Sequence, residues 1–216
     1  MKLTNGKLAA LIIALVIVID QTVKIWVKTH FYYGEELEVT SWFKILFIEN
    51  NGMAFGMELG SKLLLTLFRI IASGAFIYYL WRLRSRSDVP KGYVACIALI
   101  TAGALGNVID CIAYGLIFNN PMPPQVAQIF PPDGGYATLF NGRVVDMLYF
   151  PLCEWNWPAW MPWIGGNHFV FFQPIFNIAD ASLSVSVIVL ILFYARHLAT
   201  LGNENSENPE NPQSLE

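Results

Sequence analysis

Four long apolar stretches alternate with more polar segments along the chain. They cover about residues 7–27, 62–81, 93–112 and 174–194. A helix needs about 20 mostly apolar residues to cross the hydrocarbon core of a bilayer, so each stretch predicts one membrane-spanning helix. No small-residue cleavage site follows the first stretch, which favours an uncleaved span over a secretory signal.

The segments between the spans differ in composition. Residues 28–61 contain two runs of β-branched and aromatic residues, at 37–39 and 43–48, which favour a small sheet. Residues 113–173 are rich in Pro and in aromatic residues. Their four closely spaced tryptophans are Trp155, Trp157, Trp160 and Trp163. These side chains fit an aromatic belt or compact outer subdomain, or alternatively a surface that guides a lipid-linked substrate.

The distribution of Lys and Arg predicts how the spans are oriented. Basic residues stand at the start of the first span, at Lys2 and Lys7, occur through the loop Arg82–Lys91 and follow the fourth span at Arg196. Four spans place these three positions on one side of the membrane, and the positive-inside rule assigns that side to the cytoplasm. Segments 28–61 and 113–173 are then expected on the outer side.

The composition agrees with a membrane protein. Hydrophobic residues make up 55% of the chain and charged residues 13%, whereas soluble domains carry about 25% charged residues. No basic stripe is present, so a nucleic-acid partner is not expected.

Residues 1–200 are expected to form a single membrane domain. Residues 201–216, rich in Asn, Glu, Pro and Ser, are expected to form a disordered cytoplasmic tail.

Four carboxylates are expected at one depth near the outer surface. Asp20 lies in the outer part of the first span. At 1.5 Å per residue, Asp110 lies about 26 Å along the third span and Asp180 about 9 Å into the fourth. Asp146 lies in the outer segment between those two spans. Carboxylates within a membrane are costly, so they are functional candidates.

Structural roles are an alternative for several of these polar residues. Asp20 and Lys24 stand at i and i+4 and could form a plain ion pair. Asn107 and Asn177 could join helices through hydrogen bonds, and Asp110 could merely support its neighbours. A common explanation is still needed for several carboxylates at one level.

Paired carboxylates suit the hydrolysis of a peptide bond. Two close carboxylates share one proton, because ionising both is costly. The ionised partner can take a proton from water while the protonated partner hydrogen-bonds the scissile carbonyl. This chemistry needs no cofactor. The cysteines and histidines show no metal-ligand spacing, so no metal is expected.

Five short motifs, taken together, identify a family. In chain order they are Asp20-Gln21-x-x-Lys24, Asn50-Asn51-Gly52-Met53-Ala54-Phe55, Gly103-Ala104-Leu105-Gly106-Asn107-Val108-Ile109-Asp110, Val144-Val145-Asp146-Met147 and Phe176-Asn177-Ile178-Ala179-Asp180. In this order, and at these positions relative to the spans, they closely resemble signal peptidase II, the bacterial lipoprotein signal peptidase family. The resemblance covers about residues 7–195 except the outer insertion, residues 112–173.

The resemblance implies an aspartyl endopeptidase of the bacterial inner membrane with four transmembrane helices. Such an enzyme removes signal peptides from diacylglyceryl-modified prolipoproteins and cuts before the lipidated cysteine. The implied catalytic pair is Asp146 and Asp180. The residues implied or expected to bind substrate or support the pair are Asp20, Lys24, Asn50, Gly52, Asn107, Asp110, Arg143 and Asn177.

The fold class expected from the sequence is an all-α membrane protein with a small periplasmic β-rich element and an enlarged periplasmic insertion. The termini are expected in the cytoplasm and the active site at the periplasmic face. The expected partners are prolipoprotein signal peptides, membrane lipids and globomycin-type inhibitors, and the expected oligomeric state is a monomer.

The chain departs from the family pattern in two places. The family usually has Arg after the Asp of its G-N-x-x-D motif, where this chain has Cys111. A neighbour such as Arg143 could take over that role. The link 112–143 is also long for the family.

Two further residues have open roles. Arg69, inside the second span, either snorkels to the interface or acts as a counter-charge to the carboxylates. A Cys111–Cys153 disulfide is also conceivable.

Two other classes of protein fit some of these features. A small proton-coupled membrane transporter also uses intramembrane carboxylates, but would spread them along a pathway through the bilayer. A non-catalytic scaffold or lipid-binding protein would not depend on both Asp146 and Asp180. The clustering of carboxylates at one face favours the peptidase.

Overall fold

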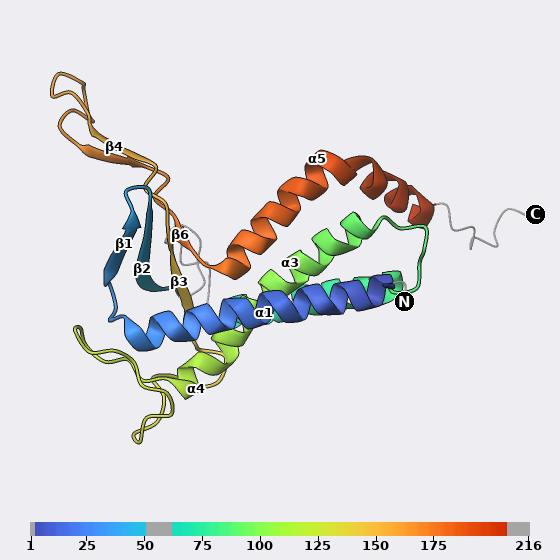
Figure 1. Ribbon diagram of the computed structural model, residues 1–216, viewed down its shortest axis with the longest axis horizontal. Helices are drawn as coiled ribbons and strands as arrows, with labels where there is room; N and C mark the ends of the chain where they lie inside the picture. The colour runs from blue at the N-terminus through green and yellow to red at the C-terminus, as the bar shows by residue number, and fades with distance from the viewer. Residues whose placement is uncertain (1–2, 51–61, 207–216) are drawn as a thin grey trace, which may run out of the picture.

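Helices and strands occupy opposite ends of an elongated molecule (Figure 1). The computed structural model describes residues 3–50 and 62–206, with the backbone alone for 196–206. The helical elements are α1 (Asn5–His30), α2 (Lys62–Leu83), α3 (Lys91–Ile109), the π-helical turn η1 (Asp110–Tyr114), α4 (Gly115–Ile117) and α5 (Ile178–Ser206). Within these described residues, four helices are long and apolar enough to cross a membrane, as the sequence predicts.

The strands form two small antiparallel sheets. They are β1 (Glu36–Thr40), β2 (Phe43–Asn50), β3 (Val144–Tyr149), β4 (Cys153–Asn156), β5 (His168–Phe171) and β6 (Ile175–Phe176). The four-stranded sheet has the order β1-β2-β3-β6, and β4 pairs with β5 alone. The predicted runs at 37–39 and 43–48 lie in β1 and β2. Asp146 lies on β3, which is an inner strand paired with β2 and β6.

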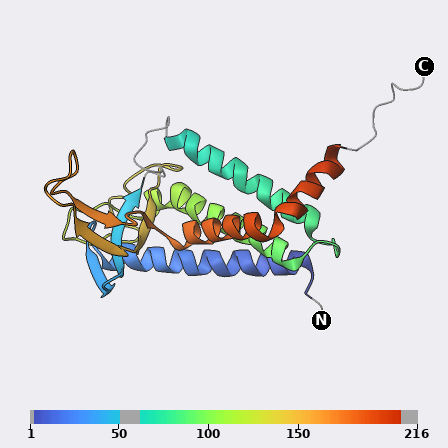
Figure 2. The same ribbon diagram turned by 90° about the horizontal axis from the view of Figure 1, so that it is seen from above.

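Helix α3 is the centre of the helical bundle. It packs against α1, α2 and α5. In the most apolar 18 residues of the span Lys91–Ile117, which contains α3, 67% are buried, compared with 17% in each of the other three spans. Figure 2 shows α1 and α2 close together at the end away from the sheets and diverging toward the sheets. The outer helices expose large apolar side chains such as Phe68, Ile71 and Leu192. These surfaces suit contact with lipid rather than water.

Two glycines on α3 allow α1 and α5 to approach closely. A Cβ atom at Gly103 would overlap the carbonyl oxygen of Ala179 and lie 2.9 Å from Oγ of Ser182. A Cβ atom at Gly106 would lie 2.8 Å from Oδ2 of Asp20 and 3.0 Å from Cβ of Ala179. Small residues at helix interfaces let backbones come together in membranes. These glycines therefore bring the polar residues of three helices within hydrogen-bonding distance.

The long segment 113–173 forms two separate parts instead of one enlarged subdomain. Its first part runs from α4 to β3 and contributes Phe118 and Ala127 to a second apolar core beside the sheet. Its later part forms the β4–β5 hairpin, which projects away from the helices (Figure 1). Trp163, beyond β4, is 97% exposed. The two parts separate because β3 lies between them and is held within the four-stranded sheet.

The ends of the fourth helix differ from the expected span 174–194. Ile175 and Phe176 pair with Tyr149 and Leu148 as strand β6, so α5 begins only at Ile178. At its other end α5 continues to Ser206, six residues into the segment expected to be disordered. Residues 207–216 of the expected tail lie outside the described residues.

The close contact at Gly103 can be tested with a matched glycine. Gly103→Ala should destabilise the protein by about 1–3 kcal/mol, because the new methyl group overlaps α5 and overpacking costs about that much. Gly74→Ala on α2 is the control, since a Cβ there meets nothing within 4 Å. Thermal unfolding in detergent measures both variants. Equal stability of the two variants would contradict the proposed close packing of α3 and α5.

Candidate active site

Lys24 lies at the centre of a buried polar cluster between α1 and α3. Its side chain is fully buried and pairs with Asp20 at 2.9 Å and with Asp110 at 2.8 Å. Its Nζ also donates to Oδ1 of Asn107 at 2.9 Å. Three acceptors satisfy the three N–H groups of an ammonium. The predicted i, i+4 pair of Asp20 and Lys24 is thus present, but as part of a larger cluster.

The two carboxylates around Lys24 also hold neighbouring backbone. Oδ1 of Asp20 accepts the N–H of Ala179 at 2.9 Å, in the first turn of α5. Oδ2 of Asp110 accepts the N–H of Val145 at 3.3 Å, on β3. Acidic groups are favourable at helix N-termini, where N–H groups lack intrahelical partners. Asp20 therefore fixes the start of α5, and Asp110 fixes the residue before Asp146.

Asn177 connects Asp146 with Asp180. Its Nδ2 donates to Oδ1 of Asp146 at 2.7 Å, and its Oδ1 accepts the N–H of Asp180 at 2.9 Å. Oδ2 of Asp180 accepts the N–H of Asn177 at 3.4 Å, so the two residues form a reciprocal cap at the start of α5. Asn107 donates to Oδ1 of Asp180 at 2.7 Å. The two asparagines thus orient both candidate catalytic carboxylates.

Asp146 is almost completely buried, with 2% of its surface exposed. Burial and the nearby charge of Asp180 raise the pKa of Asp146 to about 7, although hydrogen bonds from Asn177 and Asn50 oppose the rise. At neutral pH this carboxyl group therefore holds a proton for much of the time. One carboxyl group that retains a proton beside another carboxylate is the arrangement needed for acid–base hydrolysis.

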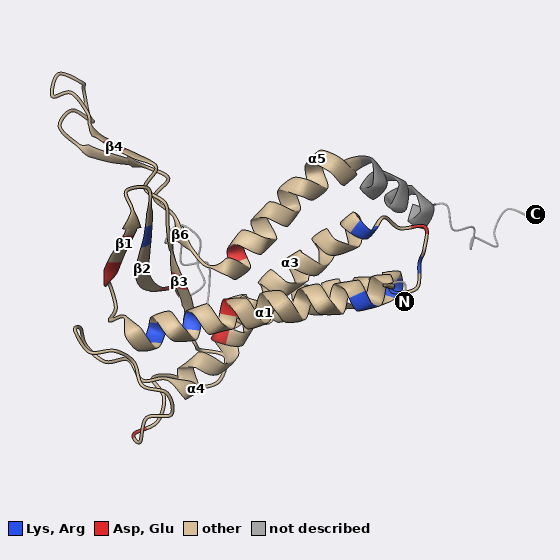
Figure 3. Ribbon diagram, viewed as in Figure 1, with Lys and Arg blue, Asp and Glu red and all other residues tan. Residues whose placement is uncertain are grey.

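Most of the predicted site residues meet in this cluster. Figure 3 shows acidic residues where α1, α3 and α5 approach the sheet. The predicted residues that meet there are Asp20, Lys24, Asn50, Asn107, Asp110, Asp146, Asn177 and Asp180. Gly52 lies outside the described residues. Arg143 pairs with Glu49 at 3.1 Å instead.

Two further polar residues complete the cluster. Nε2 of Gln21 donates to Oδ1 of Asp110 at 2.9 Å. The hydroxyl of Tyr114 donates to Oε1 of Gln21 at 3.1 Å. The sequence offered a signal for Gln21, which directly follows Asp20. It offered none for Tyr114, because this residue lies in the π-helical turn, and the regular α-helical spacing used for the sequence does not apply there.

The cysteine beside Asp110 contacts an arginine from another helix. Nη1 of Arg69 donates to Sγ of Cys111 at 3.4 Å. The side chain of Cys111 is buried, whereas Cys153 is exposed, and neither forms a disulfide. The Cys111–Cys153 disulfide considered from the sequence is therefore not formed. Arg69 is only partly exposed, and its guanidinium group lies beside the motif that contains Asp110.

The fold and the site define a multi-pass membrane protein with a buried aspartate centre at one end of its helices. A family model described as signal peptidase (SPase) II matches residues 12–196. The chain therefore belongs to the signal peptidase II family, and it is a membrane peptidase. The resemblance noted from the five sequence motifs is thus confirmed.

Known relatives and solved structures agree with this assignment. A lipoprotein signal peptidase from Porphyromonas gingivalis is 50% identical over 93% of this chain and 88% of its own length. One from Amoebophilus asiaticus is 37% identical over 82% of this chain and 73% of its own. A solved bacterial membrane enzyme shares 25% identity, covers 94% of this chain and 93% of its own, and gives a TM-score of 0.56.

The central role of Lys24 gives a stability prediction. Lys24→Met should destabilise the protein by about 3–5 kcal/mol, because it leaves two buried carboxylates without their counter-charge. Lys44→Met is the control, since its pair with Glu36 is partly exposed and such pairs contribute at most about 1 kcal/mol. Unfolding in detergent compares the two variants, and equal losses would contradict the assigned role of Lys24.

Proposed function

We propose that the protein removes signal peptides from diacylglyceryl-modified prolipoproteins, cutting before the lipidated cysteine, with Asp146 and Asp180 as the catalytic pair. The observation that carries this proposal is the hydrogen-bonded unit around Asn177, whose side-chain amide donates to the carboxyl group of Asp146 and whose backbone N–H donates to that of Asp180. Membership of the signal peptidase II family and the names of the relatives support the substrate class.

The arrangement suggests how the reaction proceeds. The raised pKa of Asp146 lets the pair retain one proton near neutral pH. The ionised member takes a proton from water as the water oxygen attacks the scissile carbonyl carbon, and the protonated member stabilises the carbonyl oxygen. When the C–N bond breaks, a proton passes to the leaving amine. Because the pair titrates as a unit, the proton belongs to both members.

Asn107 and Asn177 have a defined task in this scheme. Asn107 donates to Oδ1 of Asp180, and Asn177 donates to Oδ1 of Asp146. These two amides fix the orientation of the carboxyl groups that act on water and substrate. Lys24 in turn accepts no proton from the pair, because its three N–H groups are directed to Asp20, Asp110 and Asn107. It keeps the Asn107 side chain oriented.

The topology that we propose places the protein in the bacterial inner membrane, with cytoplasmic termini and the active site at the periplasmic face. Lys7 lies in the first turn of α1, Arg84 directly follows α2 and Lys91 begins α3. Basic residues at the ends of the helices far from the sheets (Figure 3) favour a cytoplasmic location for that end. We further propose contact with membrane lipids, sensitivity to globomycin-type inhibitors and function as a monomer.

A proton-coupled transporter fits the described residues less well. Such a protein needs titratable groups at successive depths through the membrane. Asp20, Asp110 and Asp180 instead gather in one cluster, since Lys24 pairs with the first two and Asn107 connects Lys24 to the third. Figure 3 shows acidic residues where α1, α3 and α5 approach the sheet. One level of carboxylates suits chemistry at a surface rather than passage across the bilayer.

Removal of either catalytic carboxylate tests the proposal. Asp146→Asn and Asp180→Asn should each lower the cleavage rate roughly a thousandfold, because the members of a catalytic unit act together. Cleavage of a diacylglyceryl-modified prolipoprotein by purified protein in detergent measures this. Asp133→Asn, at an exposed site in the first part of the insertion, is the control. If the wild-type protein cleaves the substrate and both Asp146→Asn and Asp180→Asn retain this activity, the two residues are not the catalytic pair.

The dependence of activity on pH tests the shared proton. Because the pKa of Asp146 is raised to about 7, its carboxyl group is protonated below that pH and ionised above it. The value of kcat/KM should therefore fall as pH rises above about 7, when both carboxyl groups become negative. Initial rates measured from pH 5 to pH 9 on wild-type protein would show the fall. A rate that stays constant through this alkaline range contradicts the assignment.

A further inference from the structure

A second charge cluster lies beside the candidate active site, with two of its side chains buried and the third, that of Arg143, 35% exposed. It consists of Lys28 on α1, Glu49 on β2 and Arg143 immediately before β3. Lys28 Nζ donates to Oε1 of Glu49, and Nη1 of Arg143 donates to Oε2 of Glu49 at 3.1 Å. The side chains of Lys28 and Glu49 are each only 2% exposed. Both oxygens of the Glu49 carboxylate are thus used by cations from different parts of the chain.

Aromatic rings from the long insertion cover this cluster. Lys28 Nζ lies 5.3 Å from the centre of the Phe118 ring and 5.2 Å from that of Tyr136. The Tyr136 ring also lies 5.1 Å from the guanidinium carbon of Arg143, and its hydroxyl accepts the backbone N–H of Arg143 at 2.7 Å. Aromatic faces attract cations at such distances. Tyr136 therefore contacts both cations and holds the start of β3.

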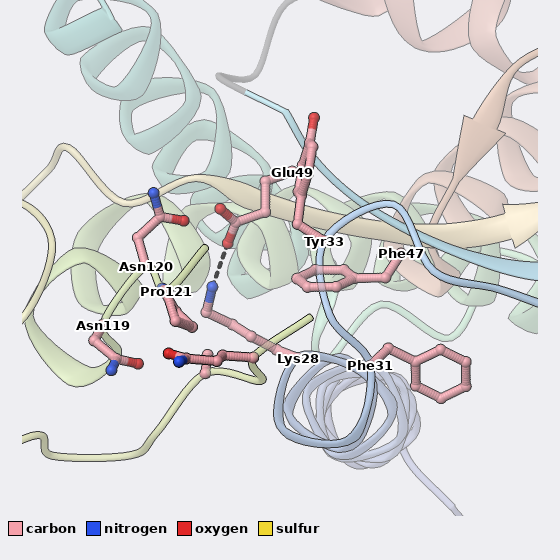
Figure 4. A pocket seen from close by; sticks show the side chains of 10 residues that line it. Lys28, Phe31, Tyr33, Phe47, Glu49, Asn119, Asn120 and Pro121 are labelled. Atoms are coloured by element: carbon pink, nitrogen blue, oxygen red, sulfur yellow. Dashed lines mark hydrogen bonds and ion pairs between the residues drawn. The ribbon is translucent and has the colours of Figure 1, made fainter. Parts of the chain in front are cut away.

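A small pocket opens beside Lys28 and Glu49. Figure 4 shows the two side chains pointing toward each other, with Phe47 on one side and Asn119 on the other. Asn119 also belongs to the insertion, and its Oδ1 accepts the backbone N–H of Gln128 at 2.7 Å. The first part of the insertion is therefore folded against the cluster instead of standing free of it.

The cluster is connected to Asp146 through the sheet. Glu49 pairs in register with Val145, and the preceding residue Ile48 pairs with Asp146. The residue that follows Glu49 is Asn50, which hydrogen-bonds to the side chain of Asp146. A shift of Glu49 would consequently move both the strand beside Asp146 and one of its hydrogen-bond partners.

We propose that Glu49 is a positioning residue for Asp146, and that the first part of the insertion serves to enclose the Lys28–Glu49–Arg143 cluster. Burying charges is costly, and a well-packed apolar group of similar size often gives equal or greater stability. Orientation of β2 and β3 gives such a cluster a use that apolar packing alone does not. The inference rests on the proposed catalytic role of Asp146.

A double substitution separates positioning from stability. Glu49→Gln removes the charge and should lower both stability and kcat, because it leaves two cations without their counter-charge. Lys28→Met combined with Glu49→Leu removes both buried charges and should return the melting temperature to near that of the wild type. Its kcat on a diacylglyceryl-modified prolipoprotein should still be reduced about tenfold, because small displacements of catalytic groups lower the rate steeply.

A control variant on the same sheet tests whether the loss of any ion pair lowers kcat. Glu36→Gln breaks the partly exposed pair with Lys44 on the same sheet and should leave kcat unchanged. KM should stay within about twofold of wild type in the double variant, as expected when only transition-state interactions weaken. A double variant with wild-type stability and wild-type kcat would overturn the positioning role.

A parallel assay keeps this inference distinct from the proposed function. Wild-type protein and Asp180→Asn are measured with the same prolipoprotein. If the wild type cleaves, Asp180→Asn does not, and the double variant is fully active, only the role of Glu49 is rejected. If Asp146→Asn and Asp180→Asn both remain active, the catalytic pair itself is wrong, and with it the basis for positioning Asp146.

Discussion

The whole site depends on neutralising charges within a membrane protein, and one ammonium group does most of this. Lys24 is fully buried and pairs with Asp20 and Asp110. A lone buried charge would be very costly, so the three groups must remain together. Because Asp20 binds the first turn of α5 and Asp110 binds the backbone of β3, keeping these charges together also fixes the two elements that carry Asp180 and Asp146.

The required close approach explains why small residues occupy one face of α3. Gly106 leaves room for the carboxylate of Asp20, and Gly103 leaves room for the start of α5. After Gly106, α3 passes into the π-helical turn that begins at Asp110. Such turns are rare and occur often at functional sites. Here the turn begins at the residue that accepts the N–H of Val145, so the change in helical winding coincides with the contact to β3.

The sequence predicts the parts of this structure that have strong local signals. Apolar length gives the four spans, and depth along those spans brings Asp20, Asp110 and Asp180 to one level. Contacts between distant segments leave weaker signals. The expected span 174–194 includes Ile175 and Phe176, because this strand is apolar and only two residues long. Its pairing with β3 depends on Leu148 and Tyr149, which precede their partners by 28 and 26 positions in the chain.

The buried cluster around Glu49 shows why part of the site cannot be predicted locally. In the sequence Lys28 and Glu49 look like ordinary charged residues, and Arg143 is singled out only as a neighbour of the family motifs. Only the fold brings the three together. Asp146 lies on the strand between two charge clusters, since Lys24 acts on β3 through Asp110 and Glu49 acts on it through β2. A strand fixed from both sides leaves its carboxyl group little freedom. This restriction serves catalysis by a carboxyl pair, because a misplacement of about 1 Å can lower the rate about a hundredfold.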